Sequence, residues 1–251
     1  MRMLFPDAAE PVDPAAVYAD VPTAPGRPSV RLNMIVSVDG GTSWNGVSGA
    51  LGGPADKAVF AIMRSLTDVV LVASGTMRAE HYGPVVMSQQ VQDERRSRGQ
   101  EPVPPIAVVS SSCRFDWSSP FFRAATTRPF IVTVASADPA LRAQAAEVAE
   151  VIVAGDETVD LAHAVAELGA RGAERILAEG GPTLNGELAR AHLLDELCVT
   201  LAPLLASGDA KRLIAGSALD ELTRLDLRSI CEQDEYLFLR YRPATDPTGP
   251  T

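Results

Sequence analysis

The chain has few cysteines, no long apolar run and no excess of positive charge. Cys113, Cys198 and Cys231 stand alone without Cys-x-x-Cys spacing, which excludes a disulfide framework and a zinc site and predicts reduced, mostly buried thiols. No apolar stretch approaches the length of a membrane helix, and the N-terminal residues, with acidic groups and scattered prolines, do not resemble a signal peptide. We therefore expect a cytoplasmic protein with no membrane partner.

Basic residues are also fewer than acidic residues. Lysine and arginine total 22 against 32 aspartates and glutamates, and the net charge of −10 opposes nucleic-acid binding, which needs a basic face. The three histidines are scattered, and no Gly-x-Ser-x-Gly nucleophile elbow occurs. An anionic ligand would need local help from backbone amides and a few arginines.

Apolar segments alternate between strand and helix patterns along most of the chain. With 46% hydrophobic residues among 251, the chain can bury one full α/β core, and nothing in the pattern requires two domains. We predict strands at 106–110, 130–135 and 151–154, helices at 141–148 and 159–168, and then strands at 197–205, 226–230 and 236–241. This predicts a mostly parallel sheet flanked by helices, with an antiparallel C-terminal end.

The two ends of the chain read differently from its middle. Residues 1–28 hold six prolines and are expected to form an arm in which Asp13 and Pro14 can start one short helix. The main domain is predicted at 29–242, and residues 243–251 are expected to be a disordered tail.

The most informative stretch is an apolar run that ends in Glu179-Gly180-Gly181-Pro182 and leads into a helix pattern. A strand that enters a helix through a glycine turn directs free N–H groups and the positive end of the helix dipole to one point, where a phosphate fits. The alternative is a turn that serves only tight packing, which is common in α/β proteins.

A second segment, from Arg31 to Gly41, alternates in polarity. Leu32, Met34, Val36 and Val38 fall on one face, and the other face carries Arg31, Asn33, Ile35, Ser37 and Asp39. Such a polar face can bind a ligand. The alternative is a half-exposed or edge strand that ends in an Asp-Gly turn.

A third segment is a β-branched run, 68–73, that ends in Ser74-Gly75-Thr76. The run is typical of a parallel strand buried on both faces. Open α/β sheets bind ligands at the carboxyl ends of their strands, where Ser74 to Thr76 and Glu179 to Gly181 would both lie. We expect these two strand ends to meet.

Taken together, the three segments resemble the reductase domain of riboflavin biosynthesis, a family with the dihydrofolate-reductase-like fold. The resemblance rests on Ser37-Val38-Asp39-Gly40, on Gly75-Thr76 with Glu80, and on Glu179-Gly180-Gly181-Pro182 followed by a strand that ends in Ala202-Pro203. It runs from about Val30 to Tyr241 and is closest to stand-alone, actinobacterial-type members. The zinc deaminase signatures of bifunctional relatives, His-x-Glu and Pro-Cys-x-x-Cys, are absent.

The resemblance implies an NADPH-dependent reduction of a 5-amino-6-ribosylaminopyrimidinedione 5′-phosphate to its ribitylamino form, by hydride attack on C1′ of the opened sugar. It also implies a homodimer, for which the apolar stretch 197–202 offers a face unless that strand is buried inside the sheet. The implied roles are Asp39 as the catalytic or orienting carboxylate, Asn33, Ser37 and Arg64 for the substrate, and Ser74, Gly75, Thr76, Glu80, Glu179, Gly180, Gly181 and Pro182 for the cofactor.

The sequence departs from the family where the substrate is gripped. The Leu-Thr-x-Arg stretch expected after the acidic residue is missing, since Glu80 is followed by His81-Tyr82-Gly83-Pro84. Arg64, on the predicted helix 55–66, matches a family arginine near the substrate phosphate, or it pairs with Asp68 at the end of that helix. The cluster of Arg95, Arg96 and Arg98 either assists or forms a solvated surface.

Two other functions remain open from the residues alone. One keeps the fold and cofactor but changes the substrate to dihydrofolate or another pterin or imine. The other is a non-catalytic nucleotide-binding module, against which the retention of Asp39, Thr76, Glu80 and the glycine turn counts.

Overall fold

The computed structural model describes residues 1–244 and divides the chain into two compact units. The first unit comprises residues 1–24 and 29–62 and the chain from Pro182 on; the second comprises 25–28 and 63–181. Helix α2 (Pro54–Leu66) runs from the first into the second. The predicted tail is 243–251, of which residues 245–251 lie outside the described part of the chain. The predicted domain bounds of 29–242 stay a prediction.

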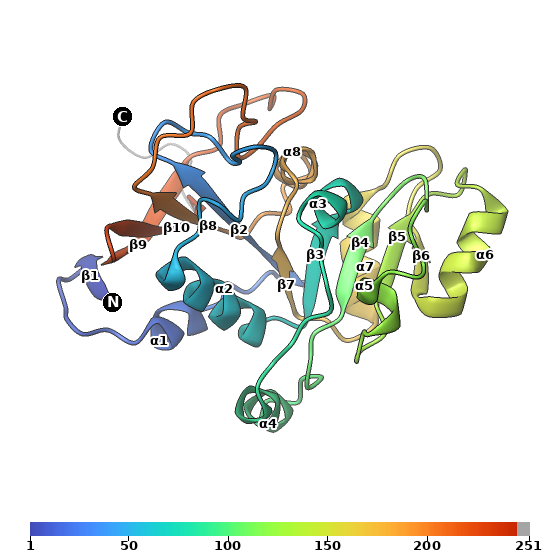
Figure 1. Cartoon of the computed structure of the whole chain (residues 1–251), viewed down its shortest axis with the longest axis horizontal. Coiled ribbons are helices and arrows are strands. Elements are labelled where there is room, and N and C mark those ends of the chain that lie inside the picture. The colour runs from blue at the N-terminus through green and yellow to red at the C-terminus, as the bar shows by residue number, and fades with distance from the viewer. Residues whose placement is uncertain (245–251) are drawn as a thin grey trace. The chain divides into compact units, whose positions relative to one another are not determined.

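The first unit holds five strands in the order β1-β9-β10-β8-β2 (Figure 1). Their bounds are β1 Arg2–Phe5, β2 Ser29–Ser37, β8 Glu196–Ala202, β9 Leu225–Gln233 and β10 Tyr236–Pro243, with helices α1 Pro14–Ala19 and α8 Pro182–Arg190. β2 and β8 are parallel, and the other pairs are antiparallel. The antiparallel C-terminal end of the sheet is therefore confirmed.

Burial does not alternate along β2, where Arg31 and Leu32 are both buried and Asn33 to Val36 are all half-buried. The predicted polar face is nevertheless the covered one in the neighbouring strands β8 and β10, whose buried residues lie on that side. Ile35 of β2 and Phe238 of β10 both lie opposite Thr200 of β8, whereas Met34 and Leu239 lie opposite Val199. Thr200 and Phe238 are buried, and Val199 and its two partners are half-buried. Polar side chains can face inward here because charged and hydrogen-bonding partners meet them there.

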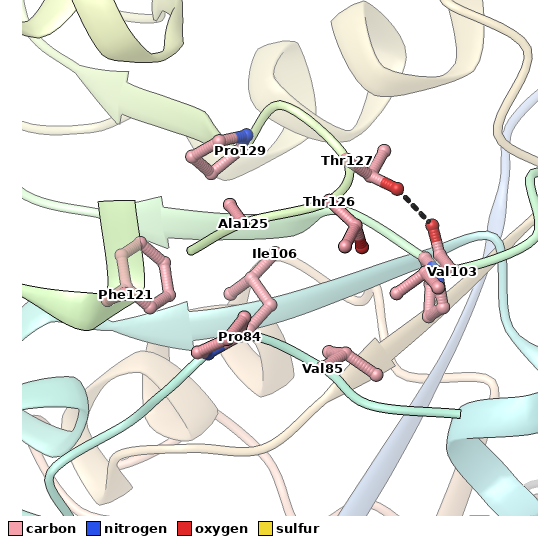
Figure 2. A pocket seen from close by; sticks show the side chains of 10 residues that line it. Pro84, Val85, Val103, Ile106, Phe121, Ala125, Thr126, Thr127 and Pro129 are labelled. Carbon is pink, nitrogen blue, oxygen red and sulfur yellow. Dashed lines mark hydrogen bonds between the residues drawn. The ribbon is translucent and has the colours of Figure 1, made fainter. Parts of the chain in front are cut away.

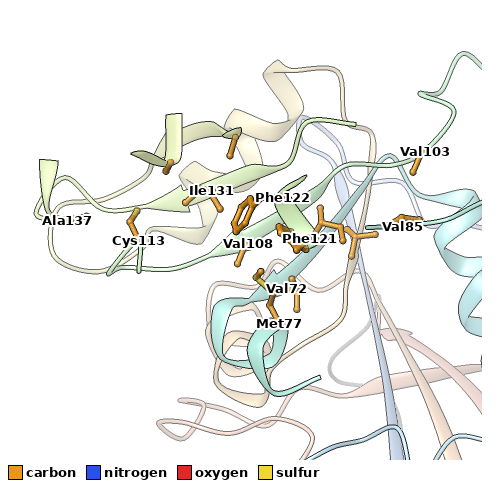
Figure 3. Close-up of a cluster of buried hydrophobic side chains, with 14 of the residues drawn as sticks. Val72, Met77, Val85, Val103, Val108, Cys113, Phe121, Phe122, Ile131 and Ala137 are labelled. Carbon is orange, nitrogen blue, oxygen red and sulfur yellow. The ribbon is translucent and has the colours of Figure 1, made fainter. Parts of the chain in front are cut away.

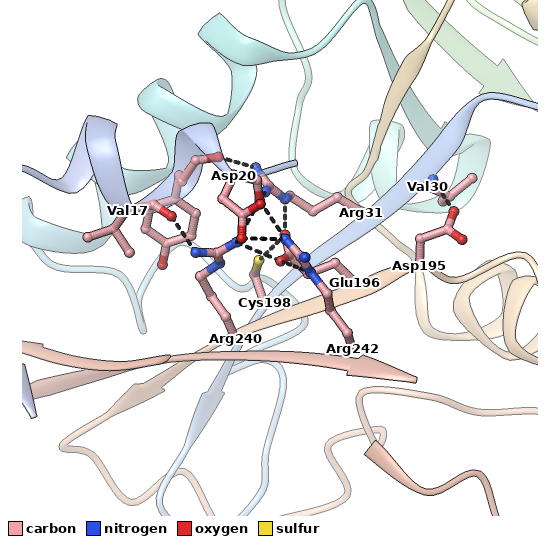
Figure 4. A network of polar contacts seen from close by, with 10 residues as sticks. Val17, Asp20, Val30, Arg31, Asp195, Glu196, Cys198, Arg240 and Arg242 are labelled. Carbon is pink, nitrogen blue, oxygen red and sulfur yellow. Dashed lines mark hydrogen bonds and ion pairs between the residues drawn. The ribbon is translucent and has the colours of Figure 1, made fainter. Parts of the chain in front are cut away.

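Those partners form a buried ion network around Glu196 (Figure 4). Its fully buried carboxylate pairs with Arg31 on β2 and with Arg240 (2.7 Å) and Arg242 (3.1 Å) on β10. The same three arginines donate to the carbonyl of Asp20, at the C-terminal end of α1. The N-terminal arm is thus fixed to this sheet face, because all three arginines also donate to the carbonyl at the end of α1.

The second unit is built on an entirely parallel sheet in the order β7-β3-β4-β5-β6. Its strands are β3 Val69–Ala73, β4 Ile106–Val109, β5 Phe130–Thr133, β6 Glu150–Val153 and β7 Arg175–Ala178. Its helices are α3 Ser74–Ala79, α4 Gln89–Ser97, α5 Pro120–Arg123, α6 Pro139–Val148 and α7 Leu161–Ala170. Every strand and helix predicted between 106 and 170 is present to within a few residues.

A hydrophobic core covers one part of this parallel sheet (Figure 3). Val72 of β3, Val108 of β4 and Ile131 of β5 are almost fully buried and pack with Phe121 and Phe122 of α5. The β-branched runs that predicted these strands are therefore the side chains that form the core.

Helix α4 is not among the helices predicted from the sequence, in which only the cluster of Arg95, Arg96 and Arg98 marks this segment. Ser88 caps its N-terminus by accepting from the amide of Val91, and Gln89–Asp93 and Gln90–Glu94 hydrogen bonds of 2.9 Å support its exposed side. Such i,i+4 pairs and a cap stabilise a helix that has almost no apolar face, so hydrophobic periodicity could not reveal it.

Candidate active site

The glycine turn follows β7 in the second unit, as predicted. The amide of Glu179 donates to the carbonyl of Leu71 (2.9 Å), and the carbonyl of Gly180 accepts from the amide of Ala73 (2.7 Å). The ends of β7 and β3 therefore lie side by side, which confirms the expected meeting of the two strand ends.

Both positions of the turn favour glycine, Gly180 through its backbone conformation and Gly181 through the close approach of a side chain. Gly180 has a φ of +88°, in the left-handed region that glycine adopts without penalty. A Cβ atom on Gly181 would lie 2.5 Å from Oγ1 of Thr76. Within residues 1–244 the amide N–H of Gly181 has no hydrogen-bond partner, and Pro182 follows as the first residue of α8. A donor at such a turn can serve an anion.

The other predicted cofactor residues follow β3 without a gap. Ser74, Gly75 and Thr76 form the first turn of α3, where the sequence suggested only a strand end with small residues. Glu80 ends the helix and donates its amide to the carbonyl of Thr76 (2.9 Å). Thr76 thus lies where predicted, against the glycine turn, and its role toward a cofactor stays a prediction.

Glu179 and Arg64 form a buried ion pair. Nε of Arg64 donates to Oε1 of Glu179 and Nη2 donates to Oε2, both at 2.7 Å, and the hydroxyl of Tyr82 donates to Oε2 at 2.7 Å. Asp68 accepts from the side chain of Gln100 (2.6 Å) instead. The predicted contact of Arg64 with a substrate phosphate stays a prediction, now for a side chain with two nitrogens already bonded to a carboxylate.

Asp39 lies in the first unit, just beyond the end of β2, and is exposed. Its carboxylate accepts from the hydroxyl of Ser37 and from the amides of Ala206 (3.1 Å) and Ser207 (2.7 Å). The hydroxyl of Ser37 and then these two amides lower the pKa of Asp39 to about 2. The carboxylate is therefore ionised at neutral pH, which suits a fixed charge better than a proton donor.

Asn33 and Ser37 share the covered face of β2. In the parallel register with β8 they lie opposite Cys198 and Ala202, on the side that also carries Thr200. Ser37 is fully buried and its hydroxyl accepts from the amide of Gly41 (2.9 Å), so it shapes the turn that holds Asp39. Its predicted contact with a substrate stays a prediction.

Asp56, in the first turn of α2, is a second carboxyl near the covered face of β2 and β8, where it contacts Thr200. It is not among the residues predicted from the sequence. Burial raises its pKa, although a hydrogen bond from Thr200 and the charge of Lys57 act in the opposite direction. An acid in the first turn of a helix is ordinary, so no sequence signal marked it. Of the two carboxyls, Asp56 is the one whose surroundings favour the protonated form.

Arg95 has a structural role that excludes it from phosphate binding. Its side chain is fully buried and donates to the carbonyls of Glu101, Ser65 and Thr67. Arg98 donates to the same Ser65 carbonyl, and Arg96 pairs with Asp93 on the surface. Arg95 and Arg98 therefore hold the C-terminal end of α2, and a role in phosphate binding stays a prediction only for the exposed Arg96 and Arg98.

An apolar pocket lies in the second unit, and its lining does not include the glycine turn (Figure 2). Its only side-chain hydroxyls are those of Thr126 and Thr127, and Thr127 already donates to the carbonyl of Val103 (2.7 Å). No charged group lines it, so it does not suit a phosphorylated ligand. Its lining comprises Pro84, Val85, Val103, Pro104, Ile106, Phe121, Ala125, Thr126, Thr127 and Pro129.

The prediction of reduced, buried cysteines is confirmed. All three cysteines are free and buried. Over residues 1–244 no group of three or more histidine, cysteine, aspartate or glutamate side chains could hold a metal ion. The same residues include no helix that is long and apolar enough to cross a membrane.

Known proteins were compared with the chain by sequence. The model of the RibD C-terminal domain family matches residues 28–239. The 2,5-diamino-6-ribosylamino-4(3H)-pyrimidinone 5′-phosphate reductase of Methanothermobacter thermautotrophicus is 32% identical over 221 residues, which cover 86% of this chain and 98% of the relative. The protein of the same name from Archaeoglobus fulgidus is 28% identical over 183 residues, covering 72% of this chain and 83% of the relative.

Solved structures agree with the sequence comparison. A pyrimidine reductase-like protein from Corynebacterium diphtheriae superposes with a TM-score of 0.81 at 28% identity, covering 94% of this chain and all of that one. Dihydrofolate reductase from Enterococcus faecalis, at 14% identity and a TM-score of 0.51 over 87% of this chain and 97% of that one, shows the shared fold alone. The chain belongs to the RibD C-terminal domain family, with the dihydrofolate-reductase-like fold that the resemblance implies.

Proposed function

We propose that the chain is a reductase of the riboflavin pathway that uses NADPH and acts on a ribosylaminopyrimidine 5′-phosphate. The observation that carries the proposal is the turn at Gly180 and Gly181. It lies beside Thr76 at the ends of two parallel strands, with an unpaired N–H donor at Gly181. The preference for NADPH over NADH rests on the family resemblance.

The proposed cofactor residues fit a dinucleotide. The amide of Gly181 would hold its pyrophosphate, because it presents a backbone donor to an anion. Ser74, Gly75, Thr76 and Glu80 would hold other parts of it. When bound, NADPH supplies the hydride for the reduction, and the protein supplies position and charge.

Two substrates differ only in the pyrimidine ring. The resemblance implies the 5-amino-6-ribosylaminopyrimidinedione 5′-phosphate, whereas the two archaeal relatives are named for the 2,5-diaminopyrimidinone counterpart. Both carry the ribosylamino group, whose C1′ is reduced, and the 5′-phosphate. We propose this shared part as the substrate determinant and leave the ring substituent to the assay.

The two carboxyls of the first unit suit complementary roles. Opening the sugar breaks the bond from C1′ to the ring oxygen, which takes a proton, and leaves a cationic iminium. We assign the proton to Asp56, whose surroundings favour the protonated acid, and the stabilising charge to Asp39, whose surroundings favour the carboxylate. Asn33 and Ser37 are proposed to orient the substrate.

A second candidate is the reduction of dihydrofolate or another imine. Asp56, whose pKa is raised by burial, would donate to an imine nitrogen as well as to a sugar oxygen, and this keeps the candidate open. The two functions differ in whether a phosphate is recognised. A non-catalytic nucleotide-binding module is the weaker alternative, and neither carboxyl would have a use in it.

The experiment is NADPH oxidation with purified protein and five substrates: the pyrimidinedione phosphate, its diaminopyrimidinone counterpart, the dephosphorylated form of each, and dihydrofolate. The proposal predicts turnover of a phosphorylated ribosylaminopyrimidine with the ribitylamino product. Turnover of dihydrofolate alone would favour the second candidate, and NADPH binding without any turnover would favour the module.

The homodimer and the cytoplasmic location stay proposals. Strand β8 pairs with β2 and β10 on its two edges, so stretch 197–202 offers no free edge. Its half-buried face, with Val199 and Leu201 beside Met34, Val36, Leu237 and Leu239, is apolar and is the surface we propose for a second copy. Light scattering that reports the monomer mass of 26.5 kDa would exclude the dimer.

A further inference from the structure

Glu179, the residue directly before the two glycines, does not turn its side chain toward a ligand. Its carboxylate is 2% exposed and accepts three hydrogen bonds of 2.7 Å, two from Arg64 and one from Tyr82. A buried carboxylate is costly unless charged and hydrogen-bonding partners surround it, and here they do. We call these three residues the clasp.

The clasp fixes the start of the glycine turn. The amide of Glu179 is held by Leu71, and the carbonyl of the next residue, Gly180, is held by Ala73. With its side chain also held, Glu179 is anchored through both its main chain and its carboxylate. The position of the Gly181 N–H therefore depends on Glu179, from which it is separated by one residue.

Tyr82 links the clasp to α3. Its amide donates to the carbonyl of Met77 in α3 (3.0 Å), and its ring lies 5.5 Å from the guanidinium carbon of Arg64. The α3 segment thus meets the turn at two points, since Thr76 faces Gly181 and Tyr82 faces Glu179. These two contacts set the separation between α3 and the glycine turn.

Arg64 and Tyr82 keep their protons throughout the neutral pH range. Burial alone would lower the pKa of Arg64, but the charge and hydrogen bonds of Glu179 outweigh it and raise that pKa. Burial and then the charge of Glu179 raise the pKa of the Tyr82 hydroxyl well above its usual value. Both groups therefore act as donors at any pH at which the protein is assayed.

We propose that Tyr82 and Arg64 are positioning residues for cofactor binding, which act through Glu179 to hold the Gly180–Gly181 turn at the separation from α3 that a pyrophosphate requires. The inference rests on the proposed function, because it assumes that the turn binds the cofactor. It assigns to Arg64 a role other than a grip on the substrate.

The test is the affinity for NADPH, measured by fluorescence or calorimetry on the full chain. Tyr82→Phe removes one hydrogen bond to a charged acceptor and should raise the Kd for NADPH about tenfold. The rate at saturating NADPH and substrate should stay within about twofold, because no group at the reacting atoms changes. Since Tyr82 keeps its proton, the loss of affinity should be the same at pH values on either side of neutrality.

Tyr18→Phe is the matched control. Tyr18 also lies against an arginine of a buried arginine–glutamate pair, with its ring 5.8 Å from Arg31, but in the first unit and far in sequence from the turn. Its replacement should leave the Kd for NADPH unchanged. A purely structural clasp would instead lower the melting temperature of Tyr82→Phe and leave its Kd equal to that of wild type, which would overturn the inference.

Arg64→Lys serves if Tyr82→Phe does not fold. Lysine keeps the charge but cannot make the two parallel bonds to Glu179, so the Kd for NADPH should rise at least as much as in Tyr82→Phe, again without a change in the saturated rate. Gly181→Val separates this inference from the proposed function. If Gly181→Val weakens NADPH binding and neither clasp variant does, the proposed function stands and the clasp role fails. If Gly181→Val binds NADPH normally, both fail.

Discussion

Oγ1 of Thr76 lies 2.5 Å from the position that a Cβ atom on Gly181 would occupy. Any side chain at position 181 would require the hydroxyl of Thr76 to move, because this group of α3 lies directly over the turn. This contact joins two residues that the sequence analysis assigned separately to cofactor binding, 105 positions apart in number, on the ends of strands that are neighbours in the sheet.

The first prediction concerns that contact. Gly181→Val should weaken NADPH binding by at least about a hundredfold, because a branched side chain would displace Thr76 and cover the free N–H. Gly49→Ala is the control, since a Cβ there meets nothing within 4 Å. An unchanged Kd in a folded Gly181→Val variant would exclude the turn as the phosphate site.

The second prediction concerns Asp39. Asp39→Asn keeps the shape of the side chain and removes its charge, so it should lower kcat by about 10- to 1,000-fold and leave the Kd for NADPH nearly unchanged. Steady-state kinetics with a separate binding titration would measure both quantities. Loss of cofactor affinity with an intact saturated rate would show that Asp39 is a binding residue.

The third prediction is a pH dependence that arises from Asp56. If Asp56 donates a proton, kcat should fall as the pH rises through the raised pKa of Asp56, because the acid is then ionised. The groups that face Asp56 are Lys57 on its own helix and Thr200 on β8. Asp56→Asn should be slower and should lose this fall in kcat.

Thr200→Val is the companion variant for Asp56. It removes the hydrogen bond that lowers the pKa of this carboxyl, so the fall in kcat should move to higher pH. A profile identical in wild type and Asp56→Asn would assign the proton to another group.

The fourth prediction is about stability. Glu196→Ala leaves Arg31, Arg240 and Arg242 without their shared carboxylate and should lower the free energy of unfolding by about 3–5 kcal/mol. Asp93→Ala breaks the exposed pair with Arg96 and should change it by less than about 1 kcal/mol. Denaturant titrations of both variants provide the measurement, and equal small effects would show that the network does not hold the N-terminal arm.

Local pattern was enough to predict much of the fold. The β-branched runs and the glycine turn act within a few residues, so the strands of the parallel sheet, the meeting of Ala73 with Gly180, and the two faces of β2 could all be predicted. Long-range pairing was beyond such patterns. Tyr82 and Glu179 are 97 residues apart, and nothing near Tyr82 indicates a buried carboxylate partner.

The polar face of β2 shows the same limit in another form. Alternation revealed which residues share a face, but the buried face is decided by what packs on it. Arg31 points inward because it pairs with Glu196 and donates to the carbonyls of Tyr18 and Asp20. These partners lie on other elements, so the sequence around Arg31 does not reveal them. For the same reason Arg95 looked like a surface charge although it is fully buried.

The most direct measurement is the rate of NADPH oxidation with a ribosylaminopyrimidine 5′-phosphate and with its dephosphorylated form. We expect the phosphorylated compound to be converted to the ribitylamino product with a lower KM than the dephosphorylated one. We also expect Gly181→Val to abolish the reaction at ordinary NADPH concentrations. Equal activity on the two forms would show that no phosphate is recognised, and turnover of dihydrofolate in their place would contradict the proposed function.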